Sequence, residues 1–141
     1  TCVGVFEGHV LGAISVDWSP NGYVLASAGE DNVAKLWDMR QKKCSATIPA
    51  HCNLISAVKF DRDFGNVLAT GSFDGTVRLW RVGRGCRWKP IKKPLAGHEG
   101  KVVGVDITAG PDPVLVTASA DRTWKLWKGI KIYSTDVLMT E

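Results

Sequence analysis

Histidine, hydroxyl and aspartate residues recur in this sequence as three sets, and these are the residue types of a hydrolase triad with its base, nucleophile and orienting carboxylate. In each set the hydroxyl residue lies four residues before the aspartate, and a tryptophan follows the aspartate by six. The sets are His9, Ser27, Asp31 and Trp37; His51, Thr70, Asp74 and Trp80; and His98, Thr117, Asp121 and Trp127. A nucleophile has to be exposed and unique, whereas these sets are equivalent and each carries its own tryptophan. We therefore expect structural polar chains rather than triads, and a protein that is not an enzyme.

The spacing between the sets indicates the elements that position them. His9, His51 and His98 are 42 and 47 residues apart, close to the period of about 40 to 45 residues of a propeller blade. Apolar and polar residues alternate as in half-buried strands, and no segment has sustained helical periodicity. The expected strands are 13–18, 24–28, 33–37 and 44–48; 55–60, 67–72 and 76–80; and 102–107, 114–119 and 123–127. The predicted class is all-β, with four antiparallel strands in a complete repeat.

These strands predict how each polar chain is built. The aspartate lies in the tight turn between the second and third strands, the hydroxyl points inward from the second, and the tryptophan comes from the third. An indole N–H can then donate to the hydroxyl, the hydroxyl to the imidazole, and the imidazole to the carboxylate. Such a chain would satisfy every buried polar group in it.

Composition and charge describe an ordinary globular chain with one basic segment. The chain has 141 residues, of which 45% are hydrophobic and 23% charged, with a formal net charge of +4. Residues 81–93 contain six basic residues and no acidic one. The basic character therefore belongs to one segment and not to the whole protein.

Four cysteines lack the spacing of a metal site. No Cys-x-x-Cys pair and no histidine at zinc-finger spacing accompanies Cys2, Cys44, Cys52 and Cys86. We expect reduced thiols of an intracellular protein, with no metal and no cofactor. No apolar run approaches about 18 residues, so neither secretion nor membrane insertion is predicted.

The repeats resemble the WD-repeat family of β-propellers, whose four-stranded blades surround a central channel. Trp37-Asp38 matches the family dipeptide, whereas Trp80-Arg81 and Trp127-Lys128 depart from it. The expected units are 1–8, an outer strand of a preceding blade; 9–50; 51–97, with a basic loop at 82–94; 98–128; and 129–141, an extension whose residues 130–133 could form an outer strand. Because closure takes roughly four to eight blades, either further blades of the same parent chain or self-association must complete the ring, and we expect the former.

Several stretches also resemble the C-terminal repeats of the WD-repeat proteins of the U4/U6 small nuclear ribonucleoprotein, the pre-mRNA processing factor 4 family. These are IPAHCNLISAVKF, GNVLATGSFDGT, LAGHEGKVVGVDI and DRTWKLW. The resemblance implies the last three blades of a seven-bladed ring in a nuclear scaffold of pre-mRNA splicing. Its partners would be splicing proteins of the U4/U6 and U4/U6·U5 particles, with U4/U6 RNA reached mainly through them. The alternatives are a ubiquitin-ligase substrate receptor, a signalling adaptor or a direct RNA-binding module.

One rim of the channel is a candidate binding surface. Its residues come just before each turn aspartate or three residues after each histidine, with Arg122 beside them. The candidates are Glu30, Leu54, Phe73, Lys101, Ala120 and Arg122. Phe73 is the strongest, because the repeat pattern requires no aromatic residue there and aromatic residues anchor interfaces. The alternatives are a turn residue folded onto its neighbours for Phe73, and solvated surface for Lys101 and Arg122.

The basic loop is a second candidate surface. Its residues are Arg84, Arg87, Trp88, Lys89, Lys92 and Lys93. The basic side chains could neutralise phosphates while Trp88 stacks on an unpaired base. A solvated connector and a protein contact are the other interpretations.

Overall fold

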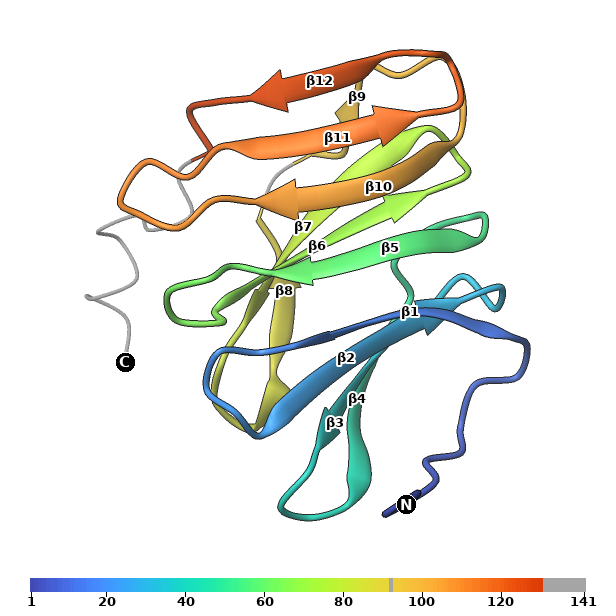
Figure 1. Cartoon of the computed structure of the whole chain (residues 1–141), viewed down its shortest axis with the longest axis vertical. Coiled ribbons are helices and arrows are strands. Elements are labelled where there is room, and N and C mark those ends of the chain that lie inside the picture. The colour runs from blue at the N-terminus through green and yellow to red at the C-terminus, as the bar shows by residue number, and fades with distance from the viewer. Residues whose placement is uncertain (92, 131–141) are drawn as a thin grey trace.

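Three antiparallel sheets, here called blades 1 to 3, make up the computed structural model, which describes residues 1–91 and 93–130 (Figure 1). Blade 1 has the order β1 (Ala13–Trp18), β2 (Val24–Gly29), β3 (Ala34–Asp38) and β4 (Lys43–Ile48). Blade 2 contains β5 (Ile55–Phe60), β6 (Val67–Ser72) and β7 (Thr76–Val82), and β7 pairs with both β8 (Trp88–Pro90) and β9 (Leu95–Ala96). Blade 3 contains β10 (Val102–Ile107), β11 (Leu115–Ser119) and β12 (Trp124–Trp127). The predicted all-β class is confirmed.

The first strand of every blade begins with the same irregularity. The register shifts between Ala13 and Ser15 in β1, between Ile55 and Ala57 in β5, and between Val102 and Gly104 in β10. A β-bulge adds one residue to a strand and increases its local twist. The irregularity therefore recurs at the same position of each repeat.

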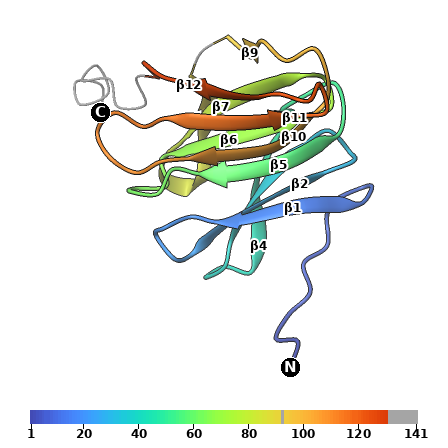
Figure 2. The same ribbon diagram turned by 45° about the horizontal axis from the view of Figure 1, so that its top comes forward.

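The blades stack face to face, so that the core lies between them (Figure 2). One cluster joins blades 1 and 2 and includes Leu36, Phe60 and Trp80. A second joins blades 2 and 3 and includes Leu79 and Ile107. Polar contacts cross the same boundaries: the Phe60 amide donates to Asp17 Oδ2 at 2.8 Å, and Ser56 Oγ donates to the Val102 carbonyl at 2.6 Å.

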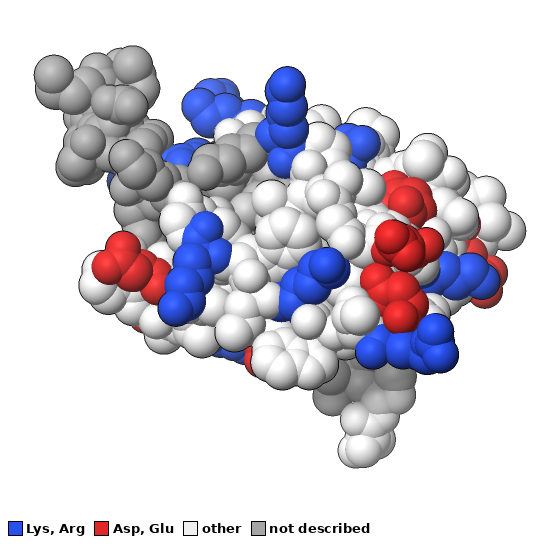
Figure 3. Space-filling view, turned by 90° about the horizontal axis from the view of Figure 1, so that it is seen from above, with Lys and Arg blue, Asp and Glu red and all other residues white. Residues whose placement is uncertain are grey.

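The two outer faces of this stack expose apolar side chains. Val16 and Trp18 of β1 are 62% and 50% exposed, and Trp124 and Leu126 of β12 are 67% and 56% exposed. Figure 3 looks onto the third blade and shows uncharged side chains between scattered lysine and arginine side chains, with a group of acidic side chains at one end. Large exposed apolar patches usually mark interaction surfaces.

The N-terminal segment, residues 1–12, forms no strand of the three sheets. The expectation that residues 1–8 form an outer strand of a preceding blade stays a prediction, because such a blade is not among the described residues. The Phe6 ring packs edge-on against Trp37, with 5.8 Å between ring centroids.

The C-terminal extension is described only as far as Ile130, which is buried in the cluster between blades 2 and 3. Residues 131–133 of the expected outer strand, and the rest of the extension to residue 141, lie outside the described residues. Over residues 1–91 and 93–130, no helix has the length and apolar character needed to cross a membrane.

Candidate functional site

The three polar chains form with the partners expected from their spacing. In blade 1, His9 Nδ1 lies 2.8 Å from Asp31 Oδ2, His9 Nε2 lies 2.6 Å from Ser27 Oγ, and Trp37 Nε1 donates to Ser27 Oγ at 2.8 Å. The same three distances are 2.8, 2.8 and 3.0 Å in the chain of His51, Asp74, Thr70 and Trp80. In the chain of His98, Asp121, Thr117 and Trp127 they are 2.9, 2.8 and 2.9 Å.

In the second chain, burial favours the neutral imidazole of His51. Because a carboxylate only accepts, Nδ1 carries the proton and Nε2 accepts from the hydroxyl. Burial lowers the pKa of His51, whose side chain is fully enclosed. Burial alone would raise the pKa of Asp74, but hydrogen bonds from Thr76 and His51 outweigh it and hold the pKa below its usual range.

The same geometry argues against a nucleophilic role for the hydroxyls. Ser27, Thr70 and Thr117 are 5%, 0% and 1% exposed. Each hydroxyl contacts an imidazole and accepts from an indole. An attacking oxygen must reach a substrate, so these sets are placed to stabilise the fold. Trp80 belongs to the cluster between blades 1 and 2, and Trp127 packs on the one between blades 2 and 3.

The predicted rim residues come together in pairs. The Glu30 amide donates to the Gly12 carbonyl, Phe73 to Leu54, and Ala120 to Lys101, each at 2.9 Å. These bonds fix the turn after each second strand to the loop before each first strand. In blade 3 that turn, between β11 and β12, lies at the right of Figure 1.

Phe73 and Lys101 meet across the boundary between blades 2 and 3. Lys101 Nζ lies 4.7 Å from the Phe73 ring centroid, a cation–π contact. Phe73 is half-buried and Lys101 is exposed. The aromatic ring is therefore partly packed on its neighbour and still presents surface. Leu54 is half-buried, whereas Glu30, Ala120 and Arg122 are exposed.

Arg122 occupies a backbone position that favours glycine. The residue after each turn aspartate is left-handed in all three blades, with φ of 66° at Asn32, 83° at Gly75 and 71° at Arg122. In this conformation the Cβ of any residue other than glycine lies too close to the following carbonyl oxygen, at a cost of about 1 to 2 kcal/mol. Arg122 therefore carries a local backbone cost that glycine would not carry.

Replacing Arg122 by glycine is therefore expected to raise the free energy of unfolding by up to about 1 kcal/mol, measured by urea denaturation. Arg87→Gly provides the control, because Arg87 has φ of −64° and gains nothing from left-handed freedom. Arg87→Gly should lower stability slightly. Equal effects of the two substitutions would contradict the assignment of strain to Arg122.

The basic segment 82–94 is not a loop throughout. It contains the short 3₁₀ turn η1 (Arg84–Cys86) and the strand β8, and its thiol Cys86 is buried. Trp88 packs edge-on against Trp80, with centroids 5.6 Å apart and an interplanar angle of 79°. Trp88 is thus an anchor for β8 rather than an open stacking platform. Arg84, Arg87, Lys89 and Lys93 are exposed, while Lys92 lies outside the described residues.

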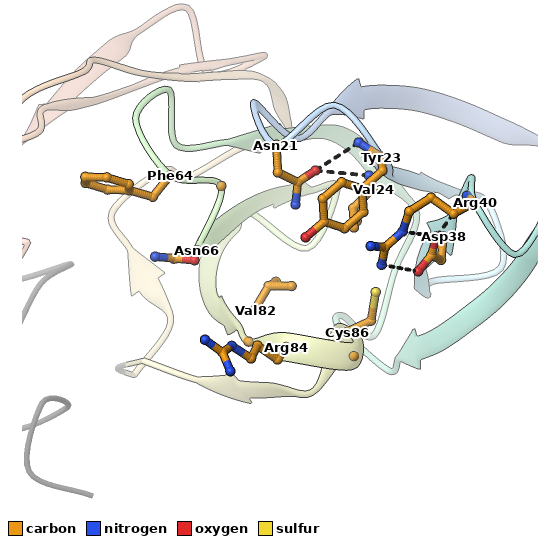
Figure 4. Close-up of a pocket in the computed structure, with 13 residues that line it drawn as sticks. Asn21, Tyr23, Val24, Asp38, Arg40, Phe64, Asn66, Val82, Arg84 and Cys86 are labelled. Atoms are coloured by element: carbon orange, nitrogen blue, oxygen red, sulfur yellow. Dashed lines mark hydrogen bonds and ion pairs between the residues drawn. The ribbon is translucent and has the colours of Figure 1, made fainter. Parts of the chain in front are cut away.

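A groove that the repeat pattern did not predict lies where blades 1 and 2 meet, at the end opposite the rim (Figure 4). Its volume is about 430 Å³, and Tyr23, Arg40, Val82, Arg84 and Cys86 are among its lining residues. The β1–β2 turn of blade 1 and the β5–β6 turn of blade 2 both contribute to the groove, together with the ends of β3 and β7. The turn η1, which supplies Arg84 and Cys86, has no equivalent in blade 1.

Comparison with known proteins places the repeats in a family. The profile of the WD40 family, described as WD domain, G-beta repeat, matches residues 1–38, 42–81 and 88–128. Over 147 residues the chain is 31% identical to the DENN domain and WD repeat-containing protein SCD1 of Arabidopsis thaliana, covering 97% of this chain. It is 32% identical over 126 residues to the transcriptional corepressor LEUNIG_HOMOLOG of Arabidopsis thaliana, covering 89% of this chain.

A third relative is the guanine nucleotide-binding protein subunit beta of Zea mays, 26% identical over 129 residues and 89% of this chain. The chain spans 12%, 15% and 34% of the lengths of these three relatives, respectively. The matched residues include all three polar chains and the strands that hold them. The chain belongs to the WD40-repeat family.

Proposed function

We propose that this chain acts as a non-catalytic protein-interaction scaffold that binds a partner protein at the rim formed by Leu54, Phe73, Lys101 and Arg122. The Phe73–Lys101 contact carries the proposal, because it places an aromatic ring and a cation on one rigid surface. Interface hot spots combine such anchoring side chains with a backbone that does not have to reorganise on binding. The paired amide hydrogen bonds of the rim provide that rigidity.

The outer faces of blades 1 and 3 support a second part of the proposal. Both expose apolar strand residues, such as Val16 and Leu126, that correspond to the residues packed between blades elsewhere in the stack. Repeat units bury their hydrophobic faces by stacking on neighbours. We propose that further blades of the same parent chain cover these two faces and complete a ring.

The proposed process is pre-mRNA splicing in the nucleus, with splicing proteins of the U4/U6 and U4/U6·U5 small nuclear ribonucleoproteins as partners. This part rests on the sequence stretches around His51 and His98, such as LAGHEGKVVGVDI. U4/U6 RNA would be reached mainly through those proteins, because Trp88 is packed on Trp80 rather than open to a base. The guanine nucleotide-binding protein relative supports a signalling adaptor as the alternative, beside a ubiquitin-ligase substrate receptor.

Affinity purification of the parent protein from nuclear extract tests the process. Bound material is washed at high salt and read by both mass spectrometry and RNA sequencing. Recovery of U4 and U6 RNAs with splicing proteins is the expected result. Recovery of signalling or ubiquitin-ligase subunits without those RNAs would keep the scaffold and replace the splicing assignment.

Replacing Phe73 by alanine is expected to weaken capture of the rim partner about tenfold or more, as for a truncated hot-spot residue. The measurement is quantitative mass spectrometry of proteins captured by wild type and variant. Asp112→Ala is the control, since Asp112 is exposed between β10 and β11, away from the rim and from every other surface proposed to bind a partner. Equal loss with both variants, or none with Phe73→Ala, would overturn the rim assignment.

A further inference from the structure

We propose that the groove between blades 1 and 2 is a second, separate interaction site, which binds an acidic peptide segment. Arg84 would receive a glutamate or aspartate side chain, and the apolar groove wall would receive a neighbouring leucine-like side chain. The site lies at the end of the blades away from Phe73. It is therefore independent of the partner proposed for the rim.

The walls of the groove combine charged and polar side chains with an apolar part. In Figure 4, Arg84 and Asn66 lie on one side, Arg40, Tyr23 and Cys86 lie on the other, and Val82 lies between them. The volume of about 430 Å³ is large enough for two side chains of a bound segment. Val82 and Cys86 are both buried, so this part of the wall is apolar and firmly held.

The charges lining the groove leave one guanidinium without a partner. Asp38 is bound by Arg40 Nη2 at 2.8 Å, by Arg40 Nε at 3.2 Å and by the Arg40 amide at 2.9 Å. Those contacts hold the pKa of Asp38 at about 2, so its negative charge is fully matched by Arg40. Within the described residues no hydrogen bond or ion pair engages the Arg84 side chain. The lining therefore has a net charge of one positive unit, centred on Arg84.

An exposed guanidinium beside an apolar wall suits a carboxylate next to an apolar side chain. The planar guanidinium can bind a carboxylate with two parallel hydrogen bonds. Arg87, Lys89 and Lys93 belong to the same acid-free segment and add to the attraction for an acidic partner.

A peptide fits this groove better than a nucleic acid does. The Arg40 guanidinium covers the Tyr23 ring at 3.8 Å, so that ring is not open to a base. A nucleic-acid strand would need several free cations in register with its phosphates. Among the residues that the structure describes, the groove itself offers one free cation, the Arg84 guanidinium.

The test uses two-dimensional ¹H–¹⁵N NMR of the whole chain with three probes. These are the peptide acetyl-Gly-Glu-Leu-Gly-amide, the same peptide with glutamine for glutamate, and hexauridylate. The glutamate peptide should produce saturable shifts at the amides of Gly83 and Gly85 and at Arg84 Nε–H. The glutamine peptide should produce shifts at least about fivefold smaller at equal concentration.

Arg84→Gln should lower the affinity of the chain for the glutamate peptide at least about fivefold. Arg87→Gln should leave that affinity within about twofold of the wild-type value. Arg87 is the matched control, because it is exposed in the same segment but does not line the groove. A dispersed spectrum of Arg84→Gln establishes that this variant is folded. Equal weakening by both variants, shifts at Gly83 and Gly85 with hexauridylate alone, or no shifts up to the solubility limit of the peptide would each overturn the proposal.

Discussion

Replacing Trp80 by alanine is expected to lower the free energy of unfolding by about 3 to 5 kcal/mol. The indole is 3% exposed and packs in the cluster between blades 1 and 2. Its removal leaves a cavity at that boundary and takes away the ring against which Trp88 packs. It also removes the N–H that donates to Thr70 Oγ1 at 3.0 Å. Three stabilising contributions are lost together, because one side chain joins the core, the polar chain and β8.

Trp124→Ala is the matched control for this prediction. Trp124 is 67% exposed on the outer face of blade 3, so its truncation should cost less than about 1 kcal/mol in the isolated chain. Both variants are measured by urea denaturation monitored by circular dichroism. A cost at Trp80 no larger than the cost at Trp124 would mean that blades 1 and 2 do not pack through this residue.

The polar chains were predictable because the same four residue types recur at the same spacing in three repeats. A single His, Thr and Asp set such as the one in blade 2 would have been ambiguous between a triad and a structural chain. The constant six-residue offset from Asp74 to Trp80 resolved the ambiguity, because it implied a strand that returns the indole to the hydroxyl. The strands of blades 1 and 3 were placed to within one residue for the same reason.

The strand β8 and the groove were not predictable in this way. Residues 88–90 read Trp-Lys-Pro within a basic stretch, and proline is rare inside strands. What makes them a strand is tertiary packing of Trp88 on Trp80, which sequence spacing does not express. The groove likewise depends on how the β1–β2 turn of one blade meets η1 of the next. The groove therefore depends on a segment, η1, in which the second repeat differs from the first.

Replacing Asp74 by alanine should destabilise the protein by about 1 to 3 kcal/mol, although the residue lies in a turn. Its Oδ2 accepts from His51 Nδ1 at 2.8 Å, and its Oδ1 accepts from the amide and the hydroxyl of Thr76 at 2.8 and 2.6 Å. The His51 side chain is fully enclosed, so removal of Asp74 takes the 2.8 Å acceptor away from a buried N–H donor. The cost is the desolvation of an unpaired donor and not only the loss of one bond.

Asp74→Asn distinguishes this explanation from a general sensitivity of the turn. Asparagine keeps an acceptor oxygen for His51 but loses the charge, so its cost should be clearly smaller than that of alanine. Asp112→Ala, at an exposed aspartate between β10 and β11, should change the free energy of unfolding by less than about 0.5 kcal/mol. An alanine cost at Asp74 as small as that at Asp112 would refute the polar chain as a stabilising element. A cost in free energy of unfolding that rises from Asp112→Ala through Asp74→Asn to Asp74→Ala would instead assign the stabilisation to the buried imidazole and its acceptor.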